Sequence, residues 1–293
     1  MRLGVLVPHQ GIGRDAGKAR AFAEAVDDLE FDYVAAIEHI VGADPDRPAG
    51  WTGPYDDSAL FHEPMVFFGF LAALMPRIEF ATTILVLPQR QVTLVAKQAA
   101  EVDILTGGRL RLGVGIGWNE VEYEALGQRF SDRGRRIEEQ VALLRLLWTS
   151  KTVDFRGRWH HIDRAGINPL PLQRPIPIWM GGEHPKALRR IARIADGWVM
   201  PATIRADAAG AKVLASFLKL VHAAGRNVAE VGVEAHMSAE NGDPEVWERE
   251  VAAFREMGVT HIHFGASQAT FTHFDHHLSA LRSFRRAALA ATR

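Results

Sequence analysis

The sequence predicts an α/β fold, a single (β/α)8 TIM barrel with loop insertions that spans residues 1–293. Strand-like and helix-like segments alternate from end to end, and there are about eight pairs, the number that closes a parallel barrel. A length of 293 residues with 47% hydrophobic content is ample for one large core. The open doubly wound sheet is the alternative, but the first strand–helix turn, residues 8–13, lacks the glycine spacing of a nucleotide fingerprint.

Each predicted strand is a short apolar run bounded by turn or polar residues. The eight runs are Leu3–Val7, Tyr33–Ile37, Glu79–Leu87, Leu110–Gly117, Ile176–Met180, Trp198–Pro201, Val231–Met237 and Thr260–Gly265. Helical periodicity follows each run, and Asp15 is the expected cap of the first helix. Two segments interrupt the alternation of strands and helices. A polar loop covers about residues 42–58, and an excursion over about 150–177 contains a predicted hairpin, Val153–His161, and a proline-rich connection.

Composition excludes several classes of protein. The formal net charge of −1 provides no electrostatic footprint for nucleic acid or for an anionic membrane. The absence of cysteine excludes disulfides and thiolate metal sites. Pro8 interrupts the first apolar run too early for a signal peptide, and no run approaches the ~18 apolar residues of a membrane span. We therefore expect a soluble cytoplasmic protein that acts on a small molecule.

Ligands of a parallel barrel bind at the carboxyl ends of its strands. The fourth strand ends in Gly113-Val-Gly-Ile-Gly117, followed by Trp118. Glycine is unfavourable inside a strand, so three of them need a reason. Either the backbone lies against a planar ring or a phosphate, or the glycines make room for a neighbouring element to pack closely. The fifth strand ends in Gly181-Gly182 just before a helix that begins at about Pro185, which favours binding of a phosphate over an ordinary tight turn.

Two histidines lie at the ends of the first two strands. His39 follows Glu38 and shares strand parity with Ile37, and His9 has the same parity as Val7 on the neighbouring strand. The pair is expected to flank one mouth, with acid–base chemistry as the functional interpretation and unreactive loop histidines as the alternative. His273, His276 and His277 lack the spacing of zinc motifs, so no metal is expected. Glu234, His236, His261 and His263 alternate on the last two strands and are expected to be structural.

Taken together, several runs resemble the luciferase-like monooxygenase superfamily, and most closely its branch that depends on the deazaflavin coenzyme F420. The matching runs follow the family order and are Tyr33–Ile40, Ala81–Pro88, Leu105–Trp118, Pro177–Gly182 and Ala195–Trp198.

The resemblance implies a flavin or deazaflavin in the barrel mouth. It implies a non-prolyl cis peptide at Thr83-Ile84 under the ring, backbone approach at Gly115 and Gly117, and a phosphate site at Gly181 and Gly182. His39 matches a residue near the hydride-transferring carbon, with Glu38 beside it as a second candidate catalytic residue. Trp118 and Pro201 complete the positions expected to contact the coenzyme.

This chain departs from the family at two positions. Glu38 stands where some deazaflavin members have aspartate. Trp118 stands where a sugar-phosphate dehydrogenase of the branch has an acidic catalytic residue, which argues against a sugar-phosphate substrate. The tryptophan is expected to wall the site or to stack on a substrate.

The expected function is hydride transfer between coenzyme F420 and a small organic substrate. The alternatives are an FMN-dependent monooxygenase that uses reduced flavin and oxygen, with a separate flavin reductase as partner, and a flavin-binding protein without catalysis. The loop with Trp51 and Tyr55 is expected to close over the substrate, and His9 is a further candidate for substrate contact. The resemblance also implies a homodimer formed through helices beside the second and third strands.

Overall fold

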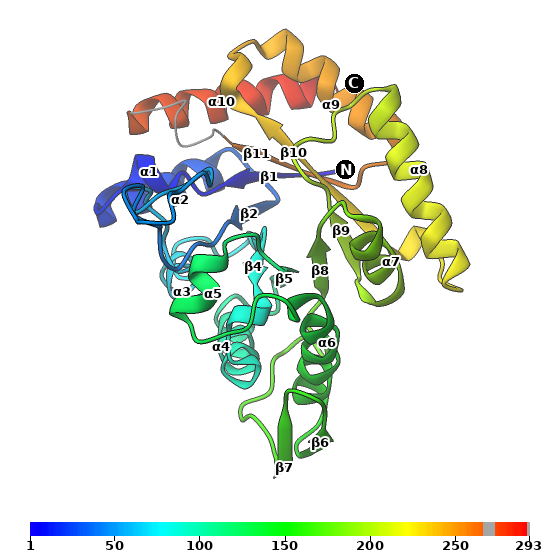
Figure 1. Cartoon of the computed structure of the whole chain (residues 1–293). Coiled ribbons are helices and arrows are strands. Elements are labelled where there is room, and N and C mark those ends of the chain that lie inside the picture. The colour runs from blue at the N-terminus through cyan, green and yellow to red at the C-terminus, as the bar shows by residue number, and fades with distance from the viewer. Residues whose placement is uncertain (266–272, 292–293) are drawn as a thin grey trace.

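Parallel strands close into an eight-stranded barrel in the computed structural model, which describes residues 1–265 and 273–291 (Figure 1). The strands run in the order β3-β2-β1-β11-β10-β9-β8-β5-β4, and pairing of β3 with β5 closes the ring. Their bounds are β1 Arg2–Leu6, β2 Tyr33–Ala36, β3 Glu79–Thr82, β4 Leu85–Val86, β5 Leu110–Gly115, β8 Ile178–Gly181, β9 Gly197–Val199, β10 Gly232–Ser238 and β11 His261–Gly265. The predicted barrel is confirmed.

The third predicted strand is divided in two. A cis peptide between Thr83 and Ile84 separates β3 from β4, so these two short strands together occupy one position in the barrel. The fourth predicted strand also ends earlier than expected, at Gly115, because Gly117 has a left-handed φ of 61° that a strand cannot contain. Both differences fall at positions that the sequence analysis assigned to ligand binding.

Helices surround the barrel. They are α1 His9–Ile12, α2 Ala16–Asp28, α3 Pro64–Ala72, α4 Val92–Leu105, α5 Glu120–Ala125, α6 Arg133–Thr149, α7 Pro185–Ile194, α8 Ala208–Ala223, α9 Pro244–Met257 and α10 Phe274–Ala290. Asp15 caps α2 as predicted, because its carboxylate accepts hydrogen bonds from the N–H groups of Gly17 and Lys18. The short helices α1 and α5 were not predicted. Within the described residues, no helix has both the length and the apolarity needed to cross a bilayer.

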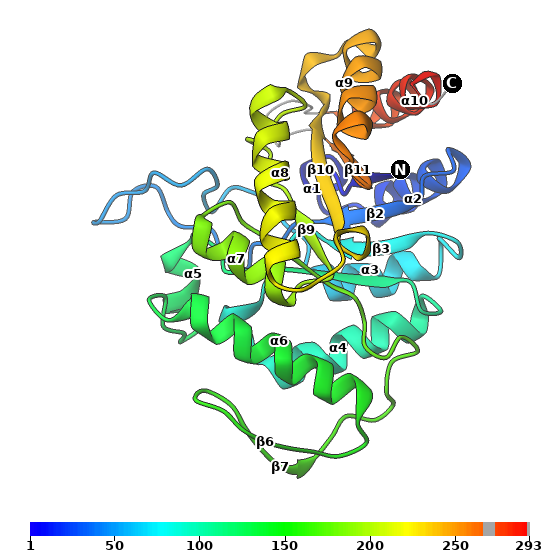
Figure 2. The same cartoon turned by 90° about the vertical axis from the view of Figure 1, so that its right-hand side faces the viewer.

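The excursion lies outside the barrel. β6 Val153–Arg156 and β7 His161–Ala165 form the predicted antiparallel hairpin, although its second strand runs further than expected. Figure 2 shows this hairpin beneath α6, whereas the loop between β2 and α3 projects from another side of the molecule. The carboxylate of Glu139 on α6 fixes the hairpin turn by accepting hydrogen bonds from the backbone N–H groups of Arg158, Trp159 and His160.

The interior of the barrel holds a buried polar layer. Glu234 accepts hydrogen bonds from Tyr33 Oη at 2.8 Å and from Arg111 Nη1 at 2.7 Å, and its Oε1 lies 3.0 Å from His263 Nδ1. Arg111 also pairs with Glu79 at 2.8 Å, and Glu79 in turn pairs with Arg2. Two of the residues expected to be structural, Glu234 and His263, belong to this layer, and every charge in it has a partner of opposite sign, but His236 and His263 also line the cavity described below.

Glycines make this layer possible. A Cβ on Gly4 would lie 2.4 Å from the ring of Tyr33, and one on Gly197 would lie 2.2 Å from the indole of Trp179. A side chain at either position would displace an aromatic ring that packs near the guanidinium of Arg111, at 4.8 Å for Tyr33 and 4.2 Å for Trp179. The layer fills the lower barrel and leaves the space above it, at the strands' carboxyl ends, for a cavity.

Candidate active site

A cavity of about 840 Å³ opens at the carboxyl ends of the barrel strands. Its volume lies in the range of sites that enclose a cofactor or a drug-sized ligand. Eight positions assigned to a coenzyme from the sequence line it together, namely Thr83, Ile84, Gly115, Gly117, Trp118, Gly181, Gly182 and Pro201. His9 and Tyr55, predicted to contact the substrate, line it as well. Residues from widely separated parts of the chain thus meet in one place.

The glycine-rich end of β5 faces the Thr83-Ile84 peptide, which is cis as the resemblance implied. A Cβ on Gly115 would lie 2.5 Å from Ile84 Cδ1, and one on Gly117 would lie 2.7 Å from Val86 Cγ1. Neither position tolerates a side chain without displacing the neighbouring one. The glycines therefore let β4 and β5 pack closely and leave Ile84 free to line the cavity floor.

The turn after β8 leads into α7. Gly182 has a φ of 139°, and the indole Nε1 of Trp198 donates a hydrogen bond to its carbonyl at 2.8 Å. That bond fixes the turn just before a helix N-terminus, where backbone N–H groups and the helix dipole favour an anion. Glu183 also lines the cavity here and adds a negative charge, while its carboxylate accepts a hydrogen bond from Thr203.

The two histidines predicted to flank one mouth lie near each other, since both pack against Phe61, but they differ in their access to the cavity. His9 lines the cavity, whereas His39 is absent from the described lining and packs against Phe61, with ring centroids 4.7 Å apart. Strand β2 ends at Ala36, so the alternation on which the parity argument relied stops before residue 39. The Nδ1 of His39 lies 3.2 Å from the buried carboxylate of Glu122, on the unpredicted helix α5.

Glu38 also lies away from the cavity. Its buried carboxylate forms an ion pair with Arg90 at 2.7 Å and accepts hydrogen bonds from the Val86 N–H and the Gln89 side chain. Burial raises the pKa of Glu38, and the charge of Arg90 opposes that shift. This geometry favours a structural role, in which Glu38 ties the end of β2 to the turn after β4.

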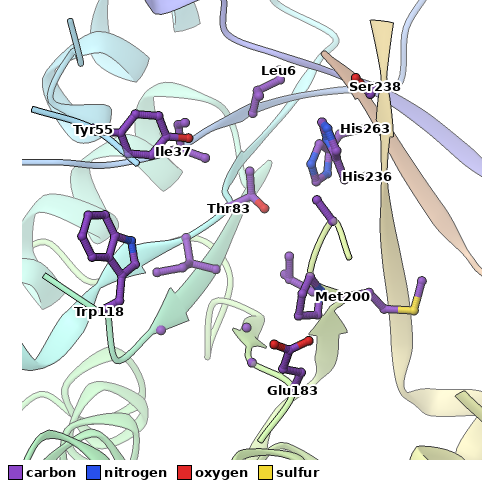
Figure 3. A pocket seen from close by; sticks show the side chains of 18 of the residues that line it. Leu6, Ile37, Tyr55, Thr83, Trp118, Glu183, Met200, His236, Ser238 and His263 are labelled. Atoms are coloured by element: carbon purple, nitrogen blue, oxygen red, sulfur yellow. The ribbon is translucent and has the colours of Figure 1, made fainter. Parts of the chain in front are cut away.

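The loop residues divide between the cavity and its rim. Tyr55 lines the cavity, and Trp118 lines it beside Tyr55 in Figure 3. Trp51 is outside the described lining, but its ring packs near that of Trp118 at 5.7 Å, and its Nε1 donates to the Tyr55 carbonyl at 2.8 Å. His39 packs against both lining residues, with its ring centroid 5.0 Å from that of Tyr55 and 5.5 Å from that of Trp118.

The opposite side of the cavity is polar and was not predicted as part of the site. His236, His263 and Ser238 gather there, across from Tyr55 and Trp118 (Figure 3), and Arg205 also lines the cavity. A sequence pattern could have identified these two histidines. His236 and His263 alternate along the last two strands and approach their carboxyl ends, but purely structural barrel layers show the same pattern. Arg205 lies in a loop without a recognisable pattern.

Two cavity histidines are neutral in the folded protein. Burial lowers the pKa of His9 to about 3, aided by the nearby His62. Burial likewise lowers the pKa of His236 to about 3, and the neighbouring His263 and Arg205 contribute in the same direction.

These shifts predict a pH-dependent stability. An unfolded histidine titrates near 6.5, so between about pH 6.5 and 3 the unfolded chain binds protons that the folded chain does not. The stability present above pH 6.5 is therefore lost as the pH falls, by up to about 1.4 kcal/mol per pH unit for each histidine. Urea unfolding at several pH values should show this slope, and His236→Gln should reduce it. An identical slope in that variant would contradict the assignment.

Comparison with known proteins identifies the family. The family model for luciferase-like monooxygenases matches residues 1–293, and the chain belongs to that family. A similar protein is the F420-dependent hydroxymycolic acid dehydrogenase of Mycobacterium tuberculosis, 28% identical over 247 residues, which cover 82% of this chain and 63% of that protein. Another is the FMNH2-dependent dimethylsulfone monooxygenase of Pseudomonas fluorescens, 32% identical over 187 residues, or 63% of this chain and 50% of that protein.

A solved structure shares the fold over the full length. An F420-dependent secondary alcohol dehydrogenase, in complex with an F420-acetone adduct, superposes with a TM-score of 0.77 and covers 99% of this chain and 98% of its own, at 18% identity. The chain spans about half the length of the first curated relatives that it matches. The relatives therefore establish the family and the fold, and leave the coenzyme and substrate to be argued from the site.

Proposed function

We propose that this protein is an oxidoreductase that transfers a hydride between coenzyme F420 and a small organic substrate. The observation that carries the proposal is the convergence of Thr83-Ile84, the β5 glycines and the Gly181-Gly182 turn on one cavity of about 840 Å³. The similarity to an F420-dependent dehydrogenase over 82% of this chain supports the same choice. When bound, a deazaflavin supplies the hydride chemistry, and the protein supplies positioning and electrostatics.

Each group of cavity residues would have a role set by its position. Thr83, Ile84 and Gly115 would hold the coenzyme ring, and the turn at Gly181-Gly182 would hold its phosphate. Trp118 and Tyr55 cover the apolar side of the cavity and would exclude water from it, with Trp51 supporting Trp118 from behind.

His39 is proposed to hold or move a proton. If its Nδ1–H donates to Glu122, Nε2 is the ring nitrogen whose lone pair can accept a proton. His39 packs against Tyr55 and Trp118 and is not among the described residues that line the cavity, so such a role requires these rings to give way as the substrate binds. If they do not, His39 acts as a positioning residue for Trp118.

An FMN-dependent monooxygenase supplied by a separate flavin reductase is the second candidate, favoured by the 32% identity to an FMNH2-dependent enzyme. The third candidate, a flavin-binding protein without catalysis, would use the same cavity.

A homodimer is proposed for each of these functions. Val66 and Phe70 on α3 and Leu94 on α4 leave apolar side chains exposed beside β2 and β3, at 73%, 39% and 53%.

Coenzyme binding separates the candidates. We expect the purified chain to bind F420 at micromolar concentrations or below and to bind FMN at least tenfold more weakly, measured for each by fluorescence titration. Micromolar FMN affinity without F420 binding would instead support the monooxygenase. Tight binding of either coenzyme without turnover would support the carrier. In a catalytically active preparation, His39→Ala should lower kcat with coenzyme affinity retained, and unchanged turnover would remove His39 from the mechanism.

A further inference from the structure

Arg205 occupies a junction between two pockets. It lies between β9 and α8 and lines both the main cavity and a second pocket of about 480 Å³. Ser238 and Glu240 line both pockets as well, and residues of α9 such as Arg249 and Glu250 form the far wall of the second one. A ligand group that reaches this junction from the main cavity therefore meets Arg205 and has further space beyond it.

The guanidinium of Arg205 has no protein partner in the part of the chain that the structure describes. Arg205 is exposed, so water can solvate its guanidinium, whereas the less accessible Arg90 and Arg111 are paired, with Glu38 and with Glu79 and Glu234. Arg205 forms neither a hydrogen bond nor an ion pair with any described residue. Its charge acts on Glu250 without a direct contact. Burial raises the pKa of the Glu250 carboxyl, and the positive charge of Arg205 opposes that increase.

Arg205 also provides the cavity's positive charge. Apart from histidines, the charged residues among the described lining are Arg205, Glu183 and Glu240. An anionic ligand group inside this cavity would be repelled by the two carboxylates and attracted by the one guanidinium. A planar guanidinium with several N–H donors suits a carboxylate or a phosphate better than any other side chain does.

Polar side chains surround the same position. Ser238 Oγ accepts a hydrogen bond from the Glu240 N–H at 3.1 Å, so its hydroxyl hydrogen remains available to a ligand. His236 lies close enough for the Arg205 charge to contribute to its lowered pKa, although burial is the larger cause. In Figure 3, Ser238, His236 and His263 gather on one side, opposite Tyr55 and Trp118. The cavity thus has an apolar wall and, facing it, a polar wall with Arg205 at its edge.

We propose that Arg205 is an anion-binding residue, which selects a ligand with a carboxylate or phosphate on one end and a planar or apolar part on the other. The apolar part lies toward Trp118, and the anionic group binds at the junction of the two pockets. The proposal rests on the proposed function in taking the main cavity as the ligand site. The anion has two sources that the test separates: an anionic group of the coenzyme side chain other than the phosphate assigned to the Gly181-Gly182 turn, or an anionic group of the substrate.

Titrations with Arg205→Gln test the proposal and separate the sources. In the coenzyme arm, F420 and the same deazaflavin ring without its phosphate side chain are titrated into the unliganded protein. If the coenzyme supplies the anion, the variant binds F420 at least tenfold more weakly and binds the bare ring unchanged. In the substrate arm, hexanoate and hexan-1-ol are titrated with and without coenzyme. If the substrate supplies the anion, the variant loses only hexanoate binding, and rising salt weakens the wild-type interaction.

Two further variants control for charge. Arg205→Lys keeps the charge without the guanidinium fork and should restore part of the lost affinity. Arg156→Gln removes an exposed arginine on the β6–β7 hairpin, outside both pockets, and should change nothing. Equal anion binding by wild-type protein and Arg205→Gln in both arms would overturn the proposal, as would an equal loss in Arg156→Gln. If F420 does not bind, the proposed F420-dependent function fails, while hexanoate binding to the unliganded protein still decides the role of Arg205.

Discussion

Replacing Arg111 with leucine is expected to lower the free energy of unfolding by about 3–5 kcal/mol, because it leaves buried carboxylates without a counter-charge. Arg111 bonds Glu234 and Glu79 at 2.7 and 2.8 Å inside the barrel, where Arg111 and Glu234 are almost wholly buried. Burial by itself would raise the pKa of Glu234, but the charge and hydrogen bond of Arg111 and those of His263 together outweigh burial and hold that pKa below its usual range. Urea unfolding near neutral pH should show the loss directly.

The loss of unfolding free energy in Arg111→Leu should depend on pH in a defined direction. In the wild type, the lowered pKa of Glu234 contributes stability above the unfolded pKa of about 4.3, and this contribution is lost as the pH falls through the folded value. Without Arg111, burial raises the pKa of Glu234, so mild acid protonates it and relieves the penalty. The gap between the two proteins should therefore be largest near neutrality and narrow toward pH 4.

A surface pair provides the control for this prediction. Arg193 is 57% exposed and pairs with Glu138 at 2.7 Å, so Arg193→Leu should cost no more than about 1 kcal/mol. A loss for Arg111→Leu that is equally small, or a gap that widens toward acid pH, would show that the inner layer does not depend on this guanidinium.

Gly115→Ala is expected to weaken coenzyme binding at least tenfold, about 1.4 kcal/mol. The new Cβ would lie 2.5 Å from Ile84 Cδ1 and 2.8 Å from its Cγ1, which is too close for the present packing. The Ile84 side chain or the backbone beside it must shift, and Ile84 lines the proposed ring site. Overpacking should also cost about 1–3 kcal/mol of stability. Fluorescence titration with the coenzyme that the wild type binds measures the first effect, and thermal unfolding measures the second.

Gly69 provides a matched substitution, because a Cβ at this position on α3 would meet no atom within 4 Å. Gly69→Ala should therefore leave coenzyme affinity unchanged. If Gly115→Ala folds and retains wild-type affinity, the close approach at the end of β5 serves strand packing alone, which is the structural alternative that the sequence left open.

The glycines and the strand ends were predictable because their signals are local. Apolar runs spaced by helical periodicity predicted eight strands, and the carboxyl ends of those strands predicted where a ligand binds. Gly115, Gly181 and Thr83 therefore lie in the cavity as expected. His39 shows where local reasoning fails. Strand alternation predicts a side chain's direction only within the strand, and β2 ends three residues before His39.

The sequence by itself determined the barrel, the family resemblance and the backbone elements of the cavity, because strand periodicity and glycine placement act over a few neighbouring residues. Only the tertiary structure decided which polar groups face that cavity. Arg205, His236 and His263 come from separate segments, and their meeting depends on barrel closure and register. The same closure paired Glu38 with Arg90 and placed His39 against Glu122, because each buried charge or polar group must find its partner across the fold.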